Sequence, residues 1–362
     1  MSSDIEDLSF FIGLNKIGMG PKTFLKLFKI YKNVEKIWNL EQGDLVENGM
    51  HPKTINMFLE NKKKIIPKNE LEKIKKLKIN TVTILDKNYP ERLKEISSPP
   101  YILFYKGDLK ILENLSLGVV GTRKMTPYGK RVCESIVYGL SKNRINIVSG
   151  LALGIDAVSH RIALESGGLT TAVLGTSLDF IYPPANYQLA MSIIEKGLIV
   201  SEFPLGTRGF PSNFPMRNRI ISGLSVGILV IEAASISGSL ITANYSIDQN
   251  REVFTIPGSI YSPQSVGCNN LIKMGAKVVT SYKDILDELN IKNKIQTEKQ
   301  EVKFESDTEK KIWNVLDFEN PASIDKIIEK SKLSVSEISS ILTLMEIRGL
   351  IKNLGGQQYV KK

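Results

Sequence analysis

Basic and small polar residues follow an apolar run near the middle of the chain. The run ends at Gly121, and Thr122, Arg123 and Lys124 come next, ahead of a helix that we expect to begin near Pro127. An arginine beside a helix N-terminus suits a phosphate oxygen. The segment matches neither the Walker A nor the dinucleotide glycine pattern. It predicts a phosphate contact, with a solvated surface turn as the alternative.

Three further turns place small residues directly after apolar runs. Their members are Gly150, Gly154, Gly175, Thr176, Ser237, Gly238 and Ser239. Small residues let a ligand approach the backbone closely, and a helix that starts there favours an anion. Several such turns on one sheet edge would make an anion-binding groove that is longer than a mononucleotide needs.

The segment 210–219 interleaves aromatic rings with arginines and asparagines. Its candidate contacts are Asn213, Phe214, Arg217, Asn218 and Arg219. A ring that stacks on an unpaired base contributes about 1–3 kcal/mol, and arginines neutralise phosphates. The segment therefore predicts contact with single-stranded nucleic acid. The alternative is that its phenylalanines belong to the core and its arginines pair with acidic neighbours.

Composition limits the possible functions. The 362 residues carry a net charge of +10, which favours a polyanionic partner. Two cysteines and two histidines have no recognisable metal-site spacing, so we expect no metal or cofactor. No apolar run reaches the roughly 18 residues of a membrane span, and the N-terminus is acidic where a signal peptide is basic. We expect a cytoplasmic protein without membrane contact.

Eight short apolar runs between residues 99 and 290 alternate with segments that can form helices. Near-continuous apolar strands are typical of a parallel sheet buried on both faces. The alternation predicts an α/β fold with a Rossmann-like, doubly wound, mostly parallel sheet. Ligands of such sheets bind beyond the carboxyl ends of the strands. This fold would bring the turns described above to one edge.

The chain divides into four predicted parts. They are a helical domain at 1–88, the Rossmann-like domain at 89–290, a polar linker at 291–306 and a winged helix at 307–362. The third helix of the last part offers only one basic residue, Arg348, which favours an accessory or protein-contact role over DNA binding.

The helical domain contains a glycine turn between two amphipathic patterns. Gly18 and Gly20 stand there, with Pro21 at the start of the next helix. Such a turn can present backbone N–H groups to a DNA phosphate, as in helix-hairpin-helix modules, or simply connect two helices.

Seven segments together resemble the DNA-processing protein A family (DprA/Smf). They read VVGTRKMTPYG, SGLALGIDAVSH, AVLGTSLDFIYPPAN, SEFPLGT, FPMRNRIISGLS, ASISGSLITA and IPGSI…GCNNLIKMGA, in order over roughly residues 90–285. The resemblance implies a Rossmann-like domain that binds single-stranded DNA, protects incoming strands in natural transformation and helps load the RecA recombinase. It also implies a homodimer, an N-terminal SAM/helix-hairpin-helix-like domain and a C-terminal winged helix.

The resemblance carries over to individual residues. It implies a phosphate-binding role for Arg123 and a DNA-contact role for Phe214, Arg217 and Arg219. Many relatives have arginine where this chain has Leu153, so one phosphate contact of the family is absent.

A nucleoside-monophosphate phosphoribohydrolase on the same type of fold is the competing hypothesis. Such enzymes use a loop glutamate, and Thr242 stands at the corresponding position here. Threonine cannot act as a base at neutral pH, which leaves Glu232 and Asp156 as substitutes. For Asp156, a loop-bracing role is the alternative to a general base. We therefore expect a DNA-binding protein rather than an enzyme.

Overall fold

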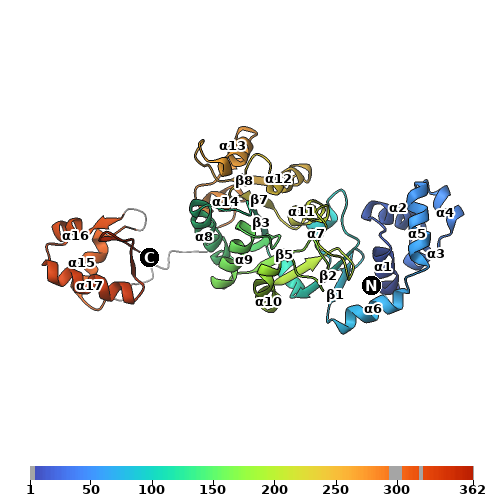
Figure 1. Ribbon diagram of the computed structural model, residues 1–362, viewed down its shortest axis with the longest axis horizontal. Helices are drawn as coiled ribbons and strands as arrows, with labels where there is room; N and C mark the ends of the chain where they lie inside the picture. The colour runs from blue at the N-terminus through green and yellow to red at the C-terminus, as the bar shows by residue number, and fades with distance from the viewer. Residues whose placement is uncertain (1–4, 293–303, 318–320, 362) are drawn as a thin grey trace. The chain divides into compact units, whose positions relative to one another are not determined.

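The computed structural model describes residues 5–292, 304–317 and 321–361. The chain divides into two compact units, Met1–Ile295 and Gln296–Lys362 (Figure 1). Most of the linker predicted at 291–306 lies outside the described residues.

Six helices form the N-terminal part of the first unit. They are α1 (Ile5–Lys16), α2 (Pro21–Tyr31), α3 (Val34–Asn39), α4 (Gln42–Glu47), α5 (Pro52–Lys62) and α6 (Pro67–Lys76). Prolines begin α2, α5 and α6. Proline lacks a backbone N–H, and at the first position of a helix that group would have no acceptor within the helix. These helices share one apolar core with the sheet that follows, because Phe24 of α2 stacks on Tyr101 with ring centroids 4.0 Å apart. We call the segment 5–76 the helical module.

A nine-stranded sheet forms the rest of the framework. Its strands are β1 (Asn80–Thr83), β2 (Ile102–Gly107), β3 (Ser116–Val120), β4 (Asn146–Ser149), β5 (Thr170–Val173), β6 (Leu198–Ser201), β7 (Gly227–Val230), β8 (Glu252–Thr255) and β9 (Lys277–Val278). The order is β1-β2-β6-β5-β4-β3-β7-β8-β9. In this order, the strands β6, β5, β4, β3, β7, β8 and β9 run parallel to one another. In contrast, β2 is antiparallel to both of its neighbours, β1 and β6.

The sheet starts earlier in the chain than the predicted boundary at residue 88. The eight apolar runs correspond to β2–β9, and β1 at Asn80–Thr83 is an additional edge strand. Its sequence NTVT holds one large apolar residue, Val82, so periodicity alone did not indicate a strand. Burial increases along β1, from the exposed Asn80 to the buried Val82 and Thr83, so only the end of this edge strand is covered.

Helices cover both faces of this sheet. They are α7 (Glu91–Lys94), α8 (Pro127–Lys142), α9 (Ile155–Glu165), α10 (Tyr187–Lys196), α11 (Asn213–Gly223), α12 (Gly238–Asp248), α13 (Val266–Lys273) and α14 (Tyr282–Glu288), with the 3₁₀ turns η1 (Leu109–Glu113), η2 (Pro184–Asn186) and η3 (Pro263–Ser265). One core joins α8, α9 and α14 to Val119 of β3, and another joins α11, α12 and α13 to Val120.

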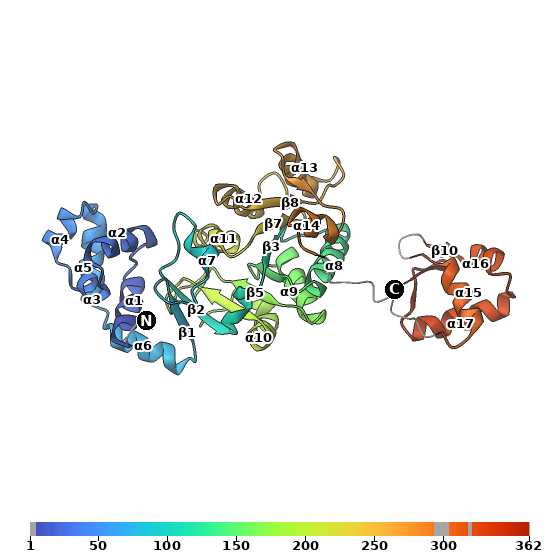
Figure 2. The same cartoon turned by 180° about the vertical axis from the view of Figure 1, so that it is seen from behind.

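Both views agree with this division, since α8 lies beside α9 and α14, and α11 beside α12 (Figure 1 and Figure 2). Neighbouring residues of one strand thus face opposite helical layers. The arrangement confirms the predicted doubly wound α/β class. The strand order reverses between β3 and β7, which is where such sheets open a ligand crevice.

The second unit has its own core. It contains α15 (Asp307–Val315), β10 (Ala322–Ser323), α16 (Ile324–Ser331), α17 (Val335–Ile347), β11 (Ile351–Asn353) and β12 (Gln358–Lys361), with a three-stranded antiparallel sheet. Ile312, Ile327 and Leu342 meet in its centre. Arg348 donates to Glu309 at 2.7 Å, so the basic residue that follows α17 is engaged within the unit.

None of the helices in the described part of the chain is long and apolar enough to cross a bilayer.

Candidate nucleic-acid interface

The predicted turns lie at one edge of the sheet. The strands β5, β4, β3 and β7 are consecutive neighbours and run parallel, so their carboxyl ends share that edge. The turn after β3 holds Arg123, the turn after β4 holds Gly154, and the turn after β5 holds Gly175. Ser237 begins α12 after β7. Residues as distant in sequence as Arg123 and Ser237 are thereby brought to a common edge.

Arg123 and Phe214 meet on this edge. The Arg123 guanidinium carbon lies 5.8 Å from the Phe214 ring centroid, within cation–π range. The Phe214 ring also lies 5.5 Å from the ring of Tyr182. Arg123 and Lys124 are exposed, and Phe214 is partly exposed at the first turn of α11. An exposed guanidinium beside two rings is an arrangement that can bind a phosphate and stack a base.

Tyr182 was not among the predicted site residues, although it is 40% exposed. It comes from the loop after β5, where the sequence shows a tyrosine before two prolines. An exposed aromatic residue in a loop is an available signal, but only the fold shows that Tyr182 lies beside Phe214.

Two glycines make room for this arrangement. A Cβ at Gly175 would lie 2.7 Å from the Phe214 ring, so only glycine lets the ring lie against the end of β5. Gly154 has φ +79° and packs against the backbone of Thr122 and Arg123. Ile155 N donates to Thr122 O at 3.3 Å. The turn that carries Arg123 is therefore held by the turn after β4.

The N-terminus of α8 is already occupied by a carboxylate. Glu232 accepts from Thr126 N at 2.9 Å and from Thr126 Oγ1 at 2.5 Å. The Thr126 hydroxyl in turn accepts from Gly129 N at 3.2 Å. This changes the expected source of phosphate attraction at the turn after β3. The side chains of Arg123 and Lys124 remain available for that role, because the Glu232 carboxylate already occupies the helix end.

Arg217, predicted to contact phosphate, is an internal brace in this structure and is only 4% exposed. Its Nη1 donates to Gly150 O at 2.7 Å and to Val173 O, which ties the ends of β4 and β5 together. Its Nε donates to Asn218 Oδ1 at 3.1 Å. Burial lowers the pKa of Arg217 to about 10, and the nearby Asp156 carboxylate opposes that shift.

Arg219 likewise departs from the prediction. Its Nη2 forms an ion pair with Glu202, and both side chains are buried. Burial raises the pKa of Glu202, while Arg219 acts in the opposite direction. These two arginines are buried because α11 is covered by the sheet on one side and by α12 on the other. Their predicted phosphate contacts are therefore replaced by a structural role.

Most other predicted residues form the support of this edge. Asn218 Nδ2 donates to Gly238 O at 3.2 Å, and Thr176 Oγ1 donates to Phe180 O at 2.6 Å. Ser237 Oγ accepts from Ser239 N at 3.3 Å at the start of α12. Asn213, Gly150 and Ser239 are buried, whereas Gly238 is exposed.

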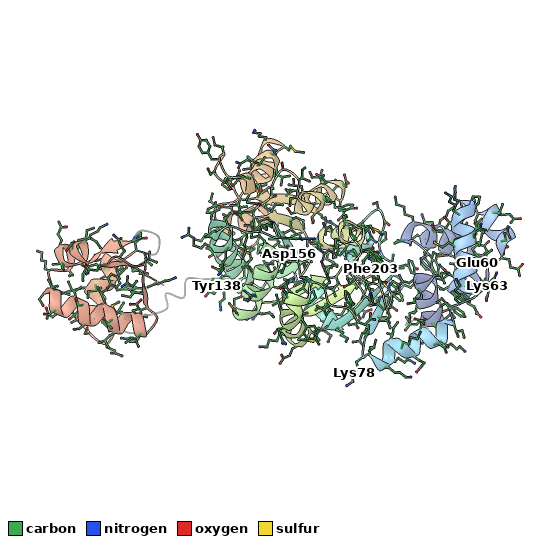
Figure 3. All side chains as sticks on the ribbon, viewed as in Figure 1. Glu60, Lys63, Lys78, Tyr138, Asp156 and Phe203 are labelled. Atoms are coloured by element: carbon green, nitrogen blue, oxygen red, sulfur yellow. The ribbon has the colours of Figure 1, made fainter. Side chains whose placement is uncertain are left out.

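The carboxylates on which the enzyme hypothesis depends hold loops in place. Asp156, inside the α/β part (Figure 3), accepts from Gly150 N at 3.1 Å and from Ala152 N at 3.4 Å. Burial raises the pKa of Asp156, and Arg217 opposes that shift. Thr242 is buried in α12. Across residues 5–292, 304–317 and 321–361, no group of three His, Cys, Asp or Glu side chains could hold a metal ion.

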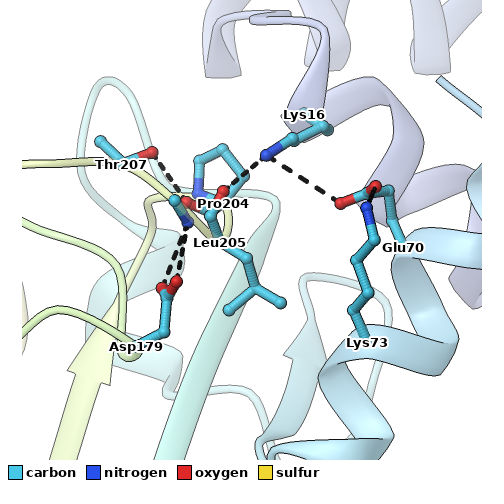
Figure 4. Close-up of polar contacts among 8 residues, drawn as sticks. Lys16, Glu70, Lys73, Asp179, Pro204, Leu205 and Thr207 are labelled. Atoms are coloured by element: carbon cyan, nitrogen blue, oxygen red, sulfur yellow. Dashed lines mark hydrogen bonds and ion pairs between the residues drawn. The ribbon is translucent and has the colours of Figure 1, made fainter. Parts of the chain in front are cut away.

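The helical module holds the segment that leads to Phe214. Asn15 Nδ2 donates to Glu202 O at 3.0 Å. Lys16 Nζ donates to Leu205 O at 2.5 Å (Figure 4). From the other side, Gly206 N donates to the carboxylate of Asp179 at 3.1 Å. The segment between β6 and α11 is thus fixed at both sides before it reaches the aromatic ring.

Comparison with known proteins agrees with this architecture. The family described as DNA recombination-mediator protein A matches residues 80–290, and the DprA winged helix domain matches residues 296–357. Protein Smf of Synechocystis is 35% identical, covering 95% of this chain and 96% of its own length. DNA processing protein DprA of Streptococcus pneumoniae is 41% identical, covering 76% and 95%.

Two solved structures are also similar. The DprA of Streptococcus pneumoniae superposes with a TM-score of 0.71 at 40% identity, covering 77% of this chain and 97% of the other. The DNA processing protein A of Helicobacter pylori, studied for its single-stranded DNA binding mode, gives a TM-score of 0.54 at 31% identity, covering 59% and 95%. On its sequence, its fold and these relatives, this chain belongs to the DNA-processing protein A (DprA/Smf) family.

Proposed function

We propose that this protein binds single-stranded DNA along the edge formed by β5, β4, β3 and β7. The observation that carries the proposal is the exposed Arg123 guanidinium over the Phe214 ring, with Tyr182 beside it. A splayed base stacks on a ring while Arg123 and Lys124 neutralise the adjacent phosphates. Duplex DNA keeps its bases stacked inside the helix, so it cannot use the rings.

The proposed biological role is that of a recombination mediator. The protein protects incoming single strands during natural transformation and loads RecA onto them. Support comes from the description of the matching family and from the single-stranded DNA binding named for the Helicobacter pylori relative. Loading is measured as the rate of RecA filament growth on strands coated with single-strand-binding protein. If this protein does not accelerate filament growth, the result contradicts the proposed role.

We also propose a homodimer. Ile236, in the loop after β7, is 96% exposed, and Ile260 and Tyr261 protrude from the loop after β8. The two loops lie together, since Ala233 N donates to Gln264 O at 2.8 Å. Neighbouring exposed apolar side chains are typical of an interface. A monomeric mass in light scattering at micromolar concentration overturns this proposal.

The central experiment compares the affinity of the protein for oligo-dT with its affinity for a duplex of equal length over a range of salt. Tight, salt-dependent binding of oligo-dT and weaker binding of the duplex is the expected result. Equal affinity for both contradicts a stacking site.

The enzyme hypothesis has its own assay. Incubation with nucleoside monophosphates releases free base only if a phosphoribohydrolase site exists. We expect none, because Glu232 and Asp156 accept hydrogen bonds within the protein.

A further inference from the structure

The helical module contains an internal repeat. Residues 18–23 read GMGPKT, and residues 49–54, which come 31 positions later, read GMHPKT. The same offset relates three pairs of apolar core residues. These pairs are Leu14 with Leu45, Phe24 with Ile55, and Leu27 with Phe58, and all six are buried. The repeat therefore covers a helix, a turn and a second helix, not the turn alone.

The two copies have the same backbone structure. In the first hairpin, Gly18 N donates to Asn15 O at 3.1 Å and Met19 N donates to Leu14 O at 3.1 Å. In the second hairpin, the equivalent bonds run from Gly49 N to Val46 O at 2.8 Å and from Met50 N to Leu45 O at 3.1 Å. Both glycines have positive φ, +89° and +66°. Pro21 and Pro52 begin α2 and α5, which are 11 residues each.

The copies also contact each other reciprocally. A Cβ at Gly18 would lie 3.7 Å from Met57 Cε of α5, and a Cβ at Gly49 would lie 3.7 Å from Lys26 Nζ of α2. Met57 and Lys26 occupy equivalent positions of the repeat, so the module has an approximate two-fold axis. Lys26 is five residues into α2, about 8 Å along that helix. The two hairpins are therefore neighbours.

The side chains of this surface differ from those of the single-strand site. Lys22 and Lys53 are exposed at equivalent positions, one beside each hairpin. Residues 1–88 hold 16 lysines, no arginine and 11 acidic residues. Among the described residues 5–88, the large apolar side chains that are exposed include no aromatic ring. The surface can attract a phosphate backbone. The exposed ring of His51, in the second hairpin, caps α5, where its Nδ1 accepts from Lys53 N at 3.2 Å.

We propose that the paired hairpins form a second nucleic-acid surface, which takes duplex DNA by its backbone. Duplex DNA carries two backbones related by a local two-fold axis, and the module presents two related lysines beside neighbouring hairpins. Lysines act as point charges without reading base edges, so binding is independent of sequence. Near the C-terminal end of α5, Glu60 is paired with Lys63 at 3.2 Å, which reduces the acidic charge on that helix (Figure 3).

The test uses the full-length chain with Lys22→Ala and Lys53→Ala together. We expect the affinity for a 20-base-pair duplex to fall about tenfold at low salt, with a salt slope smaller by about 2, because two phosphate contacts are lost. Affinity for oligo-dT stays within twofold, since the rings and Arg123 are unchanged. Arg123→Ala gives the converse pattern.

The matched control removes the same charge elsewhere, with Lys76→Ala and Lys87→Ala, two exposed lysines outside the repeat. Thermal unfolding verifies that both double variants are folded. Unchanged duplex affinity in the hairpin variant overturns the proposal. An equal loss in the control also overturns it, because net charge alone then explains the binding. The oligo-dT measurement separately tests the single-strand site, so the two proposals fail independently.

Discussion

Arg123 and the arginine pair of α11 have the same chemistry but different environments. Arg123 stands in a turn at the end of β3 and is exposed, whereas Arg217 and Arg219 are 4% and 7% exposed. All three occur in segments that predict phosphate binding. The difference shows that a guanidinium in such a pattern can stay exposed at the proposed interface or can hold together the loops that form it.

The buried pair has a clear mechanical role. Arg217 joins the ends of β4 and β5, and Arg219 joins α11 to the segment after β6 through Glu202. These are the elements that place Phe214 against Gly175. In the described part of the chain Arg123 contacts the ring of Phe214 and forms no ion pair, so its guanidinium can bind a phosphate without breaking one.

The largest effect on the free energy of unfolding is expected for Arg219→Ala. Removing one member of a buried ion pair leaves Glu202 charged and without its partner, which lowers the free energy of unfolding by about 3–5 kcal/mol. Urea denaturation measures this change, with Arg123→Ala as the exposed control. Equal stability of the two variants contradicts the distinction between buried and exposed arginines.

Phe214→Ala tests the aromatic ring that Arg123 contacts and that the elements braced by Arg217 and Arg219 hold in place. We expect affinity for oligo-dT to fall by about 1–3 kcal/mol, the value of one stacked base. Fluorescence anisotropy measures the affinity. The control is Phe210→Ala, which removes a ring that is 60% exposed. If both variants lose the same affinity for oligo-dT, the hypothesis that Phe214 in particular stacks on a base is wrong.

The charged interior also predicts a pH dependence. Burial, followed by the charge of Arg217, lowers the pKa of His160 from 6.5 to about 3. Between these values the unfolded chain binds a proton that the folded chain does not. Stability therefore falls by up to about 1.4 kcal/mol per pH unit as the pH drops below 6.5.

His160→Gln removes this contribution. Asp156 and Glu202, whose pKa values burial raises, remain in both proteins, so their opposite effects cancel in the comparison. The free energy of unfolding at pH 7 and pH 5 is measured for each. A wild-type change no larger than that of the variant contradicts a neutral, buried His160.

The smallest effect on the fold is expected for Arg123→Ala. Its free energy of unfolding stays within about 0.5 kcal/mol of wild type, as for other exposed side chains. The salt slope for oligo-dT decreases by about 0.7, the value for one phosphate contact on a single strand. An unchanged slope removes Arg123 from the interface.

Local patterns predicted much of this molecule. The apolar runs became β2–β9 because a strand buried on both faces must be apolar along its whole length. The turn that carries Arg123 and the positive-φ Gly154 were identifiable because each reflects a requirement of its own short segment. Gly175 was identifiable as a small residue after an apolar run, but the reason for it is the Phe214 ring, which is distant in sequence. The start of α15 at Asp307 likewise matches a local capping signal, Ser306 with Glu309.

The tertiary structure decided the rest. It made β1 an edge strand, brought Tyr182 to Phe214, filled the N-terminus of α8 with Glu232 and buried Arg217 and Arg219. Each of these outcomes depends on a partner distant in sequence, such as the 106 positions between Thr126 and Glu232. The residue types and their spacing state which groups are present, but burial and partners are set by contacts that form only when the sheet and its two helical layers pack together.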